Sequence, residues 1–199
     1  MADTPALAPR NALEPPSRVA CGACQDPFGD HALSCTAMGL YRRHNTLRDA
    51  FVDIATSAGL ACRTSVGLPG TNLVPADLFL PTFSDAPTAV DVSVVHPLHP
   101  SRSAQAAVTA GAAAEARAEE KVKLYGEQCR ERHWDLWAVV SETTGAWCQS
   151  GQTFVRRLAR KRTRTGVSFK EVAADCWVAV AHALARAVAR QLVWAAQTT

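Results

Sequence analysis

Residues 73–95 read LVPADLFLPTFSDAPTAVDVSVV and hold two short apolar runs with the composition of β-strands. Each run carries one aspartate, Asp77 in the first and Asp91 in the second. An ionised carboxylate inside such a run is costly to bury unless it is paired or binds a cation. On neighbouring strands the two carboxylates can converge at a sheet edge, where such oxygen ligands suit Mg²⁺ or Mn²⁺. The alternative is that each aspartate ends a strand and caps a turn.

The segments on either side predict a small mixed β-sheet flanked by helices, in the α/β (α+β) class. Strand-like runs occupy residues 61–66, 73–80, 89–95 and 134–140. Helical patterns occupy residues 42–58, 101–129, 150–163 and 168–196. Three successive strands, then a helix and a fourth strand, indicate a hairpin-like start followed by a helical crossover. The alanine-rich first half of the 101–129 helix would allow close approach to the sheet.

Length and composition allow one compact domain with a small appendage. The chain has 199 residues, of which 48% are hydrophobic and 20% charged, and a formal net charge of +3. This mildly basic balance permits nucleic-acid binding without requiring it. No apolar run approaches the roughly 18 residues of a membrane span, so we expect no membrane partner. We expect residues 1–18 to be a disordered leader and residues 146–199 to form a C-terminal helical extension.

The cysteines predict a zinc knuckle in residues 19–40 and a reducing compartment for the protein. Cys21, Cys24, His31 and Cys35 have the ligand types and short spacings of a tetrahedral CCHC zinc site. Because all four positions are filled, this zinc is expected to be structural. Asp30 is a candidate to brace the His31 imidazole. The other four cysteines are scattered in apolar or helical contexts, which favours an intracellular protein.

A lysine on the helix after the second strand is the candidate third member of the acidic site. Phosphodiester hydrolysis needs a metal ion, a positioned water and a cation near the attacking or leaving oxygen. Lys121 can be that cation, and Tyr125, one helical turn later, lies on the same helix face. A solvated helix face is the alternative for this lysine.

Together these motifs resemble the PD-(D/E)XK nuclease core. More narrowly, Pro75-Ala76-Asp77, Asp91-Val92-Ser93 and Lys121-x3-Tyr125 are similar to the restriction-like endonuclease domain of site-specific non-LTR retrotransposon polyproteins. In that family a Cys/His knuckle precedes the nuclease. The resemblance implies a nuclease core over residues 41–145, with Asp77, Asp91 and Lys121 as catalytic residues and Mg²⁺ or Mn²⁺ held by the two aspartates.

The same resemblance implies several further properties. In the family a basic His-Asn segment opens the first helix, as Arg42-Arg43-His44-Asn45 does here, with Asn45 in a supporting place. The position two after Asp91 holds Ser93 instead of the family's usual lysine, which implies a lysine relocated to the helix. The resemblance also implies a nuclear location and descent from, or membership of, a longer reverse transcriptase polyprotein.

Two basic groups are candidates to bind nucleic acid, with DNA as the expected partner and RNA as the alternative. The first comprises Arg42, Arg43 and His44 at the start of the first helix, and the second is the dense run that includes Arg156, Arg157, Arg160 and Lys161. The most favoured function is a metal-dependent DNA endonuclease that nicks one strand. A catalytically inactive zinc-dependent binding module that keeps the nuclease fold is the alternative, followed by a structural protein that oligomerises through its C-terminal helices. Target site and oligomeric state do not follow from the sequence.

Overall fold

A mixed sheet forms the centre of the protein. The structure, a computed structural model, describes residues 26–101, 103–163 and 167–197, so the predicted leader lies outside the described residues. Within them one sheet has four strands in the order β1-β2-β3-β4. The strands are β1 (Arg63–Val66), β2 (Ala76–Leu80), β3 (Thr88–Val95) and β4 (Asp135–Glu142). Strands β1 to β3 pair antiparallel and β3 pairs parallel with β4, which confirms the predicted mixed α/β sheet.

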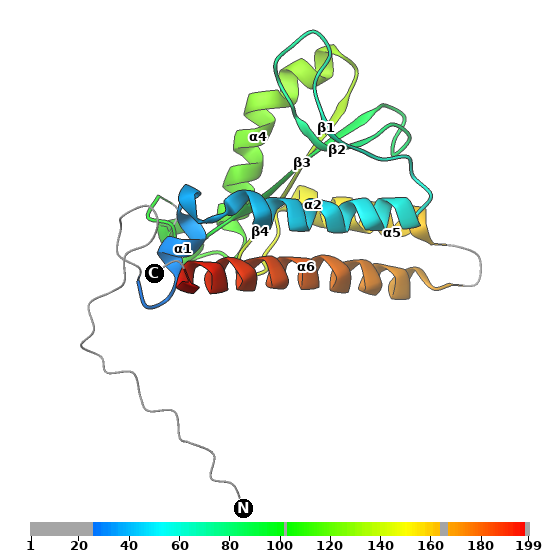
Figure 1. Ribbon diagram of the computed structural model, residues 1–199. Helices are drawn as coiled ribbons and strands as arrows, with labels where there is room; N and C mark the ends of the chain where they lie inside the picture. Colours follow the sequence, from blue (N-terminus) through cyan, green and yellow to red (C-terminus); the bar gives the residue numbers. More distant parts are fainter. Residues whose placement is uncertain (1–25, 102, 164–166, 198–199) are drawn as a thin grey trace, which may run out of the picture.

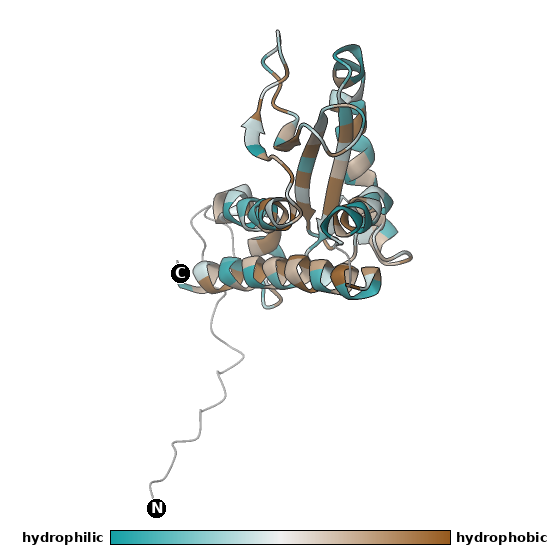
Figure 2. Cartoon of the chain, turned by 90° about the vertical axis from the view of Figure 1, so that its right-hand side faces the viewer, coloured by the Kyte–Doolittle hydropathy of each residue, from teal (hydrophilic) through white to brown (hydrophobic). Residues whose placement is uncertain are grey.

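Helices cover both faces of this sheet. On one face lie α2 (Leu40–Ser57) and α5 (Gln149–Arg162), and α6 (Phe169–Gln197) packs on both of them in an outer layer. Figure 1 shows α2 and α6 running side by side below the sheet. In Figure 2 α6 crosses beneath α2 and α5, which separate it from the strands. The opposite face is covered by α4 (Ala112–Glu131), which forms the crossover from β3 to β4.

Alternation along the strands decides which side chains enter the main core. Leu78 and Leu80 of β2 and Val90 and Val92 of β3 pack in one buried cluster with apolar side chains of α2, α5 and α6. Burying a side chain of this size stabilises the fold by about 1.5–3 kcal/mol. Since successive side chains of a strand point to opposite faces, Asp91 between the two valines is directed to the α4 face. The described part of the 146–199 segment shares this core with the rest of the fold.

The predicted helix over residues 101–129 is interrupted in the structure. A short helix, α3 (Ser103–Ala106), ends before residue 111, and α4 begins only at Ala112. Gly111 has a left-handed φ of 87° at the start of α4, which breaks the helical path. The buried carboxylate of Glu142 accepts hydrogen bonds from the N–H groups of Ala113 and Ala114, and so caps α4. The alanines Ala114 and Ala118 then pack on β4, as their small size allows.

The N-terminal described segment packs against the far end of α6. It contains α1 (Asp30–Ser34) and a short 3-10 helix (Thr36–Met38), and its Ala32 and Met38 form a small buried cluster with Ala195 of α6. By length and composition α6 would suffice to cross a membrane, unlike the expectation from the sequence. In this structure its apolar stripe packs instead against α2 and α5.

Candidate active site

Asp77 and Asp91 lie on neighbouring strands where the pairing of β2 with β3 ends. The last pair is Leu78 with Val90, and the two aspartates are the next residue of each strand beyond it. The carboxylate of Asp77 also accepts the backbone N–H of Val92, the residue after Asp91. The side chain of Asp91 is 4% exposed and that of Asp77 is 24% exposed. The acidic pair is therefore buried at Asp91 and open to solvent at Asp77.

Lys121 reaches this pair from α4. Its Nζ lies 2.7 Å from Oδ2 of Asp91 and 5.4 Å from the centre of the Tyr125 ring. The hydroxyl of Ser93, two residues after Asp91 on the same strand face, donates to Oδ1 of Asp91 at 3.2 Å. The structure thus brings Asp77, Asp91 and Lys121 together, with Tyr125 behind the lysine. Asp91 thus has two side-chain donors, the charged ammonium group of Lys121 and the neutral hydroxyl of Ser93.

His44 contacts the same site from α2. Its Nε2 lies 3.3 Å from Oδ1 of Asp77, while Oδ2 of Asp77 accepts the backbone N–H of Val92 at 2.8 Å. Tyr41, one turn earlier on α2 and 71% exposed, stacks near the imidazole with ring centroids 6.2 Å apart. We expected His44 to bind nucleic acid, and the structure places it against a candidate catalytic carboxylate. An imidazole there can exchange a proton or act as a metal ligand.

Burial and the neighbouring carboxylate of Asp77 disfavour the charged form of Asp91. Burial raises the pKa of Asp91 above its ordinary value, Lys121 opposes this through its charge and hydrogen bond, and the charge of Asp77 raises the pKa again. Both causes that raise this pKa act by disfavouring the charged carboxylate. A divalent cation between the carboxylates would relieve both, because it stabilises their charged forms.

The donor set fits Mg²⁺ or Mn²⁺ better than a metal that requires a closed protein cage. Magnesium usually keeps several waters and is held by one or two carboxylates together with substrate phosphates. Asp77 and Asp91 supply such carboxylates. Across residues 26–101, 103–163 and 167–197, no group of three or more His, Cys, Asp or Glu side chains is gathered as a metal cage. The acidic site would therefore depend on substrate and water oxygens to complete its coordination.

Half of the predicted zinc site can be placed. Cys21 and Cys24 lie outside the described residues, whereas His31 belongs to α1 and Cys35 directly follows it. The N–H of Cys35 donates to the carbonyl of His31 at 2.9 Å, so these two residues are one helical turn apart, the spacing on which the zinc prediction depends. Zinc itself stays a prediction.

The acids beside His31 have other partners than we expected. The carboxylate of Asp26 accepts the N–H groups of Phe28, Asp30 and His31, which fixes the start of α1. Asp30, expected to brace the His31 ring, instead places Oδ1 at 3.0 Å from Nε2 of the buried His96. Nδ1 of His96 lies 2.7 Å from the Thr143 hydroxyl. This chain of contacts joins α1 to the ends of β3 and β4.

Arg43 is internal, which removes it from the expected nucleic-acid surface. Its side chain is buried, with the residue only 3% exposed. The guanidinium donates to the carbonyls of Leu33 and Val94 and to Oε1 of Gln191, and so ties together α1, β3 and α6. Arg42 next to it is exposed. Oδ1 of Asn45 is buried and has no hydrogen-bond partner within the described residues.

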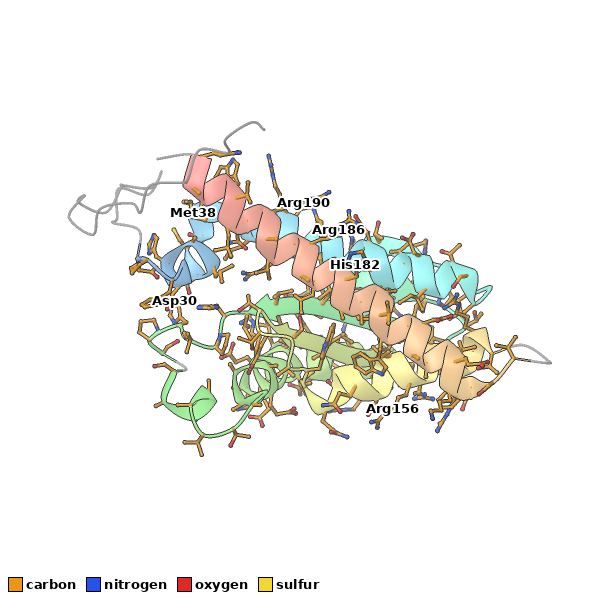
Figure 3. The ribbon with its side chains drawn as sticks, turned by 90° about the horizontal axis from the view of Figure 1, so that it is seen from below. Asp30, Met38, Arg156, His182, Arg186 and Arg190 are labelled. Carbon is orange, nitrogen blue, oxygen red and sulfur yellow. The ribbon has the colours of Figure 1, made fainter. Side chains whose placement is uncertain are left out.

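The second basic group forms an exposed face of α5. It consists of Arg156, Arg157, Arg160 and Lys161, all exposed. Arg157 lies over the rings of Phe83 and Trp137, 5.6 and 5.3 Å from their centres. Figure 3 shows Arg156 on the side of α5 away from α2. This basic face is on the α2 side of the sheet, opposite to the face from which Lys121 approaches.

The helical spacing of the core residues of α2 predicts which side of the helix faces the protein, and we did not use it for the residues before Leu47. Leu47, Phe51 and Ile54 are its core stripe. Positions three and four residues before Leu47 are His44 and Arg43, which the helical period directs to the same side as the stripe. The pattern therefore predicts that these two side chains face the protein. We read them as surface residues because of their charge.

No protein-family model matches the chain, and no curated protein matches it.

Proposed function

We propose that this protein is a metal-dependent endonuclease that nicks DNA, with Asp77, Asp91 and Lys121 as its catalytic residues. One observation carries the proposal: the Lys121 ammonium lies 2.7 Å from the buried carboxylate of Asp91, and a second carboxylate, Asp77, stands on the neighbouring strand. Hard oxygen donors beside a fixed cation are the groups that phosphodiester hydrolysis requires. The resemblance to PD-(D/E)XK nucleases, and to the endonuclease domain of non-LTR retrotransposons, supports the same activity.

Each side chain has a role that its contacts make possible. A divalent cation, when bound, would lower the pKa of the attacking water and stabilise charge on the phosphate. Asp77 and Asp91 would hold it. Lys121 would hold positive charge beside Asp91, where it can stabilise the developing charge of the phosphate or its leaving oxygen. His44, in contact with Asp77 and partly exposed, would accept or return a proton at Nε2.

Other parts of the chain would bind and align the DNA. The exposed face of α5 offers four cations to the phosphate backbone. The zinc knuckle would position the nucleic acid or brace the fold. A nuclear location and an origin in a reverse transcriptase polyprotein follow from the family resemblance and are part of this proposal.

An inactive nucleic-acid-binding module is the second candidate. Two contacts of the acidic site favour this alternative. Asp91 is paired with Lys121, and Asp77 is in contact with His44. Such pairs satisfy both carboxylates inside the protein without a substrate. Ser93 also stands where the basic nuclease pattern has a lysine.

Incubation with supercoiled plasmid separates the two functions. The nuclease predicts conversion to the open-circular form that requires Mg²⁺ or Mn²⁺ and disappears in Asp91→Ala. The binding module predicts DNA binding that weakens steeply with salt, and equal background nicking in the wild type and Asp91→Ala.

A further inference from the structure

A cavity between the start of α2 and the last turns of α6 collects arginines without acids. It has a volume of about 530 Å³, and Arg42, Arg43 and Arg190 are among its lining residues. No aspartate or glutamate is among the described residues that line it. Figure 3 shows Arg190 following His182 and Arg186 along α6, with Met38 near the end of that helix. None of Asp77, Asp91 and Lys121 lines this cavity, so it is distinct from the candidate active site.

Arg43 is a buried charge whose partners in the described chain are all neutral. Its three acceptors are two backbone carbonyls and one amide oxygen, and its Nε has no acceptor among the described residues. Burial lowers its pKa to about 10, so the group still carries its charge at neutral pH. A buried cation is stabilised well only when an anion compensates it. The adjoining cavity has room for such an anion.

The exposed arginines at the mouth of the cavity are available to the same anion. Arg42 and Arg190 are both exposed, and neither has a carboxylate within ion-pair distance in the described chain. With Arg43 they provide three guanidinium groups from two helices. Guanidinium groups match phosphate oxygens in charge and in planar hydrogen-bond geometry, which favours a phosphate dianion over a singly charged carboxylate.

The rest of the wall indicates the body of the ligand. Val193 and Trp194 give it apolar and aromatic surface, and the exposed Gln197 adds an amide group. A fatty acid would bring one negative charge to three guanidinium groups, and inorganic phosphate would leave the apolar wall uncovered. A nucleotide meets both conditions, since it joins a phosphate to a base with a flat π-face and hydrogen-bonding edges.

We propose that this cavity binds a nucleoside monophosphate unit, with the phosphate at the three arginines and the base along the wall of Val193 and Trp194. The unit comes either from a free nucleotide or from the 5′-phosphorylated end of a strand. The site goes beyond the proposed nuclease function and does not depend on the acidic site.

Calorimetric titration of the full chain with dAMP, deoxyadenosine, inorganic phosphate, dodecanoate and a 5′-phosphorylated octanucleotide tests this. We expect saturable dAMP binding, with deoxyadenosine and phosphate each about tenfold weaker or more. Arg190→Gln and Arg42→Gln should each weaken dAMP binding about tenfold. Arg186→Gln is the matched control, because this exposed arginine lies one turn away and lines the neighbouring groove instead; its affinity should equal that of the wild type.

The arms of this titration separate the outcomes. Competition between the octanucleotide and dAMP at equal affinity identifies a strand end as the source, and binding of dAMP alone identifies a free nucleotide. The site is refuted if dAMP fails to saturate, if Arg186→Gln loses as much affinity as Arg190→Gln, or if phosphate or dodecanoate binds as tightly as dAMP. Asp91→Ala should bind dAMP normally, so failure of the nuclease proposal would leave this result untouched.

Discussion

The Nζ atom of Lys121 lies 2.7 Å from Oδ2 of Asp91, although the two residues come from a helix and a strand that are 30 residues apart. Both side chains are largely buried, at 14% and 4% exposure. Burying two charges in this way is costly, and apolar residues of similar volume often stabilise a protein equally well. The pair lies at the buried end of the acidic site, and a buried charge pair of this kind is a candidate for a functional role.

Titration of Asp91 tests the electrostatics of the site. Because burial and Asp77 raise its pKa, Asp91 should titrate above its ordinary value of 3.8 in carboxyl-detected NMR. Lys121→Met should raise that pKa further, since it removes the opposing charge, and Asp77→Asn should lower it. An Asp91 pKa at or below the ordinary value, or one unmoved by both variants, would contradict the geometry.

The same shift fixes the sign of a stability effect. With its pKa higher in the folded than in the unfolded state, Asp91 makes the folded protein bind more protons between those two values. The free energy of unfolding should therefore fall as pH rises from about 4 through the folded pKa of Asp91, and Asp91→Asn should lack this component. Denaturant unfolding across this pH range measures it.

His44 should matter for the rate of nicking. Replacing His44 with Ala should slow nicking about 100-fold, the usual scale for loss of one acid–base group. His182→Ala is the control, since His182 is exposed on α6 and lines the groove between α2 and α6. A wild-type nicking rate in His44→Ala would exclude this residue from proton transfer.

The knuckle should hold one zinc ion per chain. Cys35→Ser should release that zinc and loosen α1 from the end of α6, because structural zinc sites contribute directly to folding. Cys62→Ser, at a partly buried cysteine packed against the main core, should keep it. Metal analysis after dialysis gives the ratio, and zinc retained fully by Cys35→Ser would exclude this cysteine as a ligand.

The exposed face of α5 should contribute to DNA affinity without reading sequence. Arg156→Gln and Lys161→Gln should each lower the slope of log K against log salt by about 1, uniformly across DNA sequences. Arg157 should contribute less, because its guanidinium already lies over two aromatic rings. Arg130→Gln on α4 is the control. Slopes identical to that of the wild type in both α5 variants would place the DNA elsewhere.

Much of the fold could be predicted because the hydrophobic periodicity and the turn-forming residues indicate the same element boundaries along the chain. The short apolar run of residues 89–95 and the helical stripe of Leu47, Phe51 and Ile54 gave the right elements within a few residues. The predicted 101–129 helix failed between Ala106 and Ala112, where Gly111 takes a left-handed φ and Glu142 of a distant strand caps the start of α4. The glycine is a local signal for this break, whereas a cap made across the fold leaves no trace in a local pattern.

The candidate site shows the same limit. Asp77, Asp91 and Lys121 could be chosen from residue type, spacing and family resemblance, because carboxylates in apolar strands are conspicuous. The place of His44 beside Asp77 and the burial of Arg43 required knowing which side of α2 meets the sheet. The charge of both residues suggested an exposed position. In the structure Arg43 instead donates to α1 and β3, and His44 contacts Asp77 of β2.

The most direct test of the central claim is the single-turnover rate of Mg²⁺-dependent nicking of supercoiled DNA by matched variants. Asp91→Asn and Lys121→Met should each reduce the rate by at least about 100-fold. Asp53→Asn and Lys123→Met, at exposed positions on the same two helices that carry His44 and Lys121, should nick at the wild-type rate. Nicking that persists in Asp91→Asn and Lys121→Met, or falls equally in all four variants, would contradict a hydrolytic site built from these side chains.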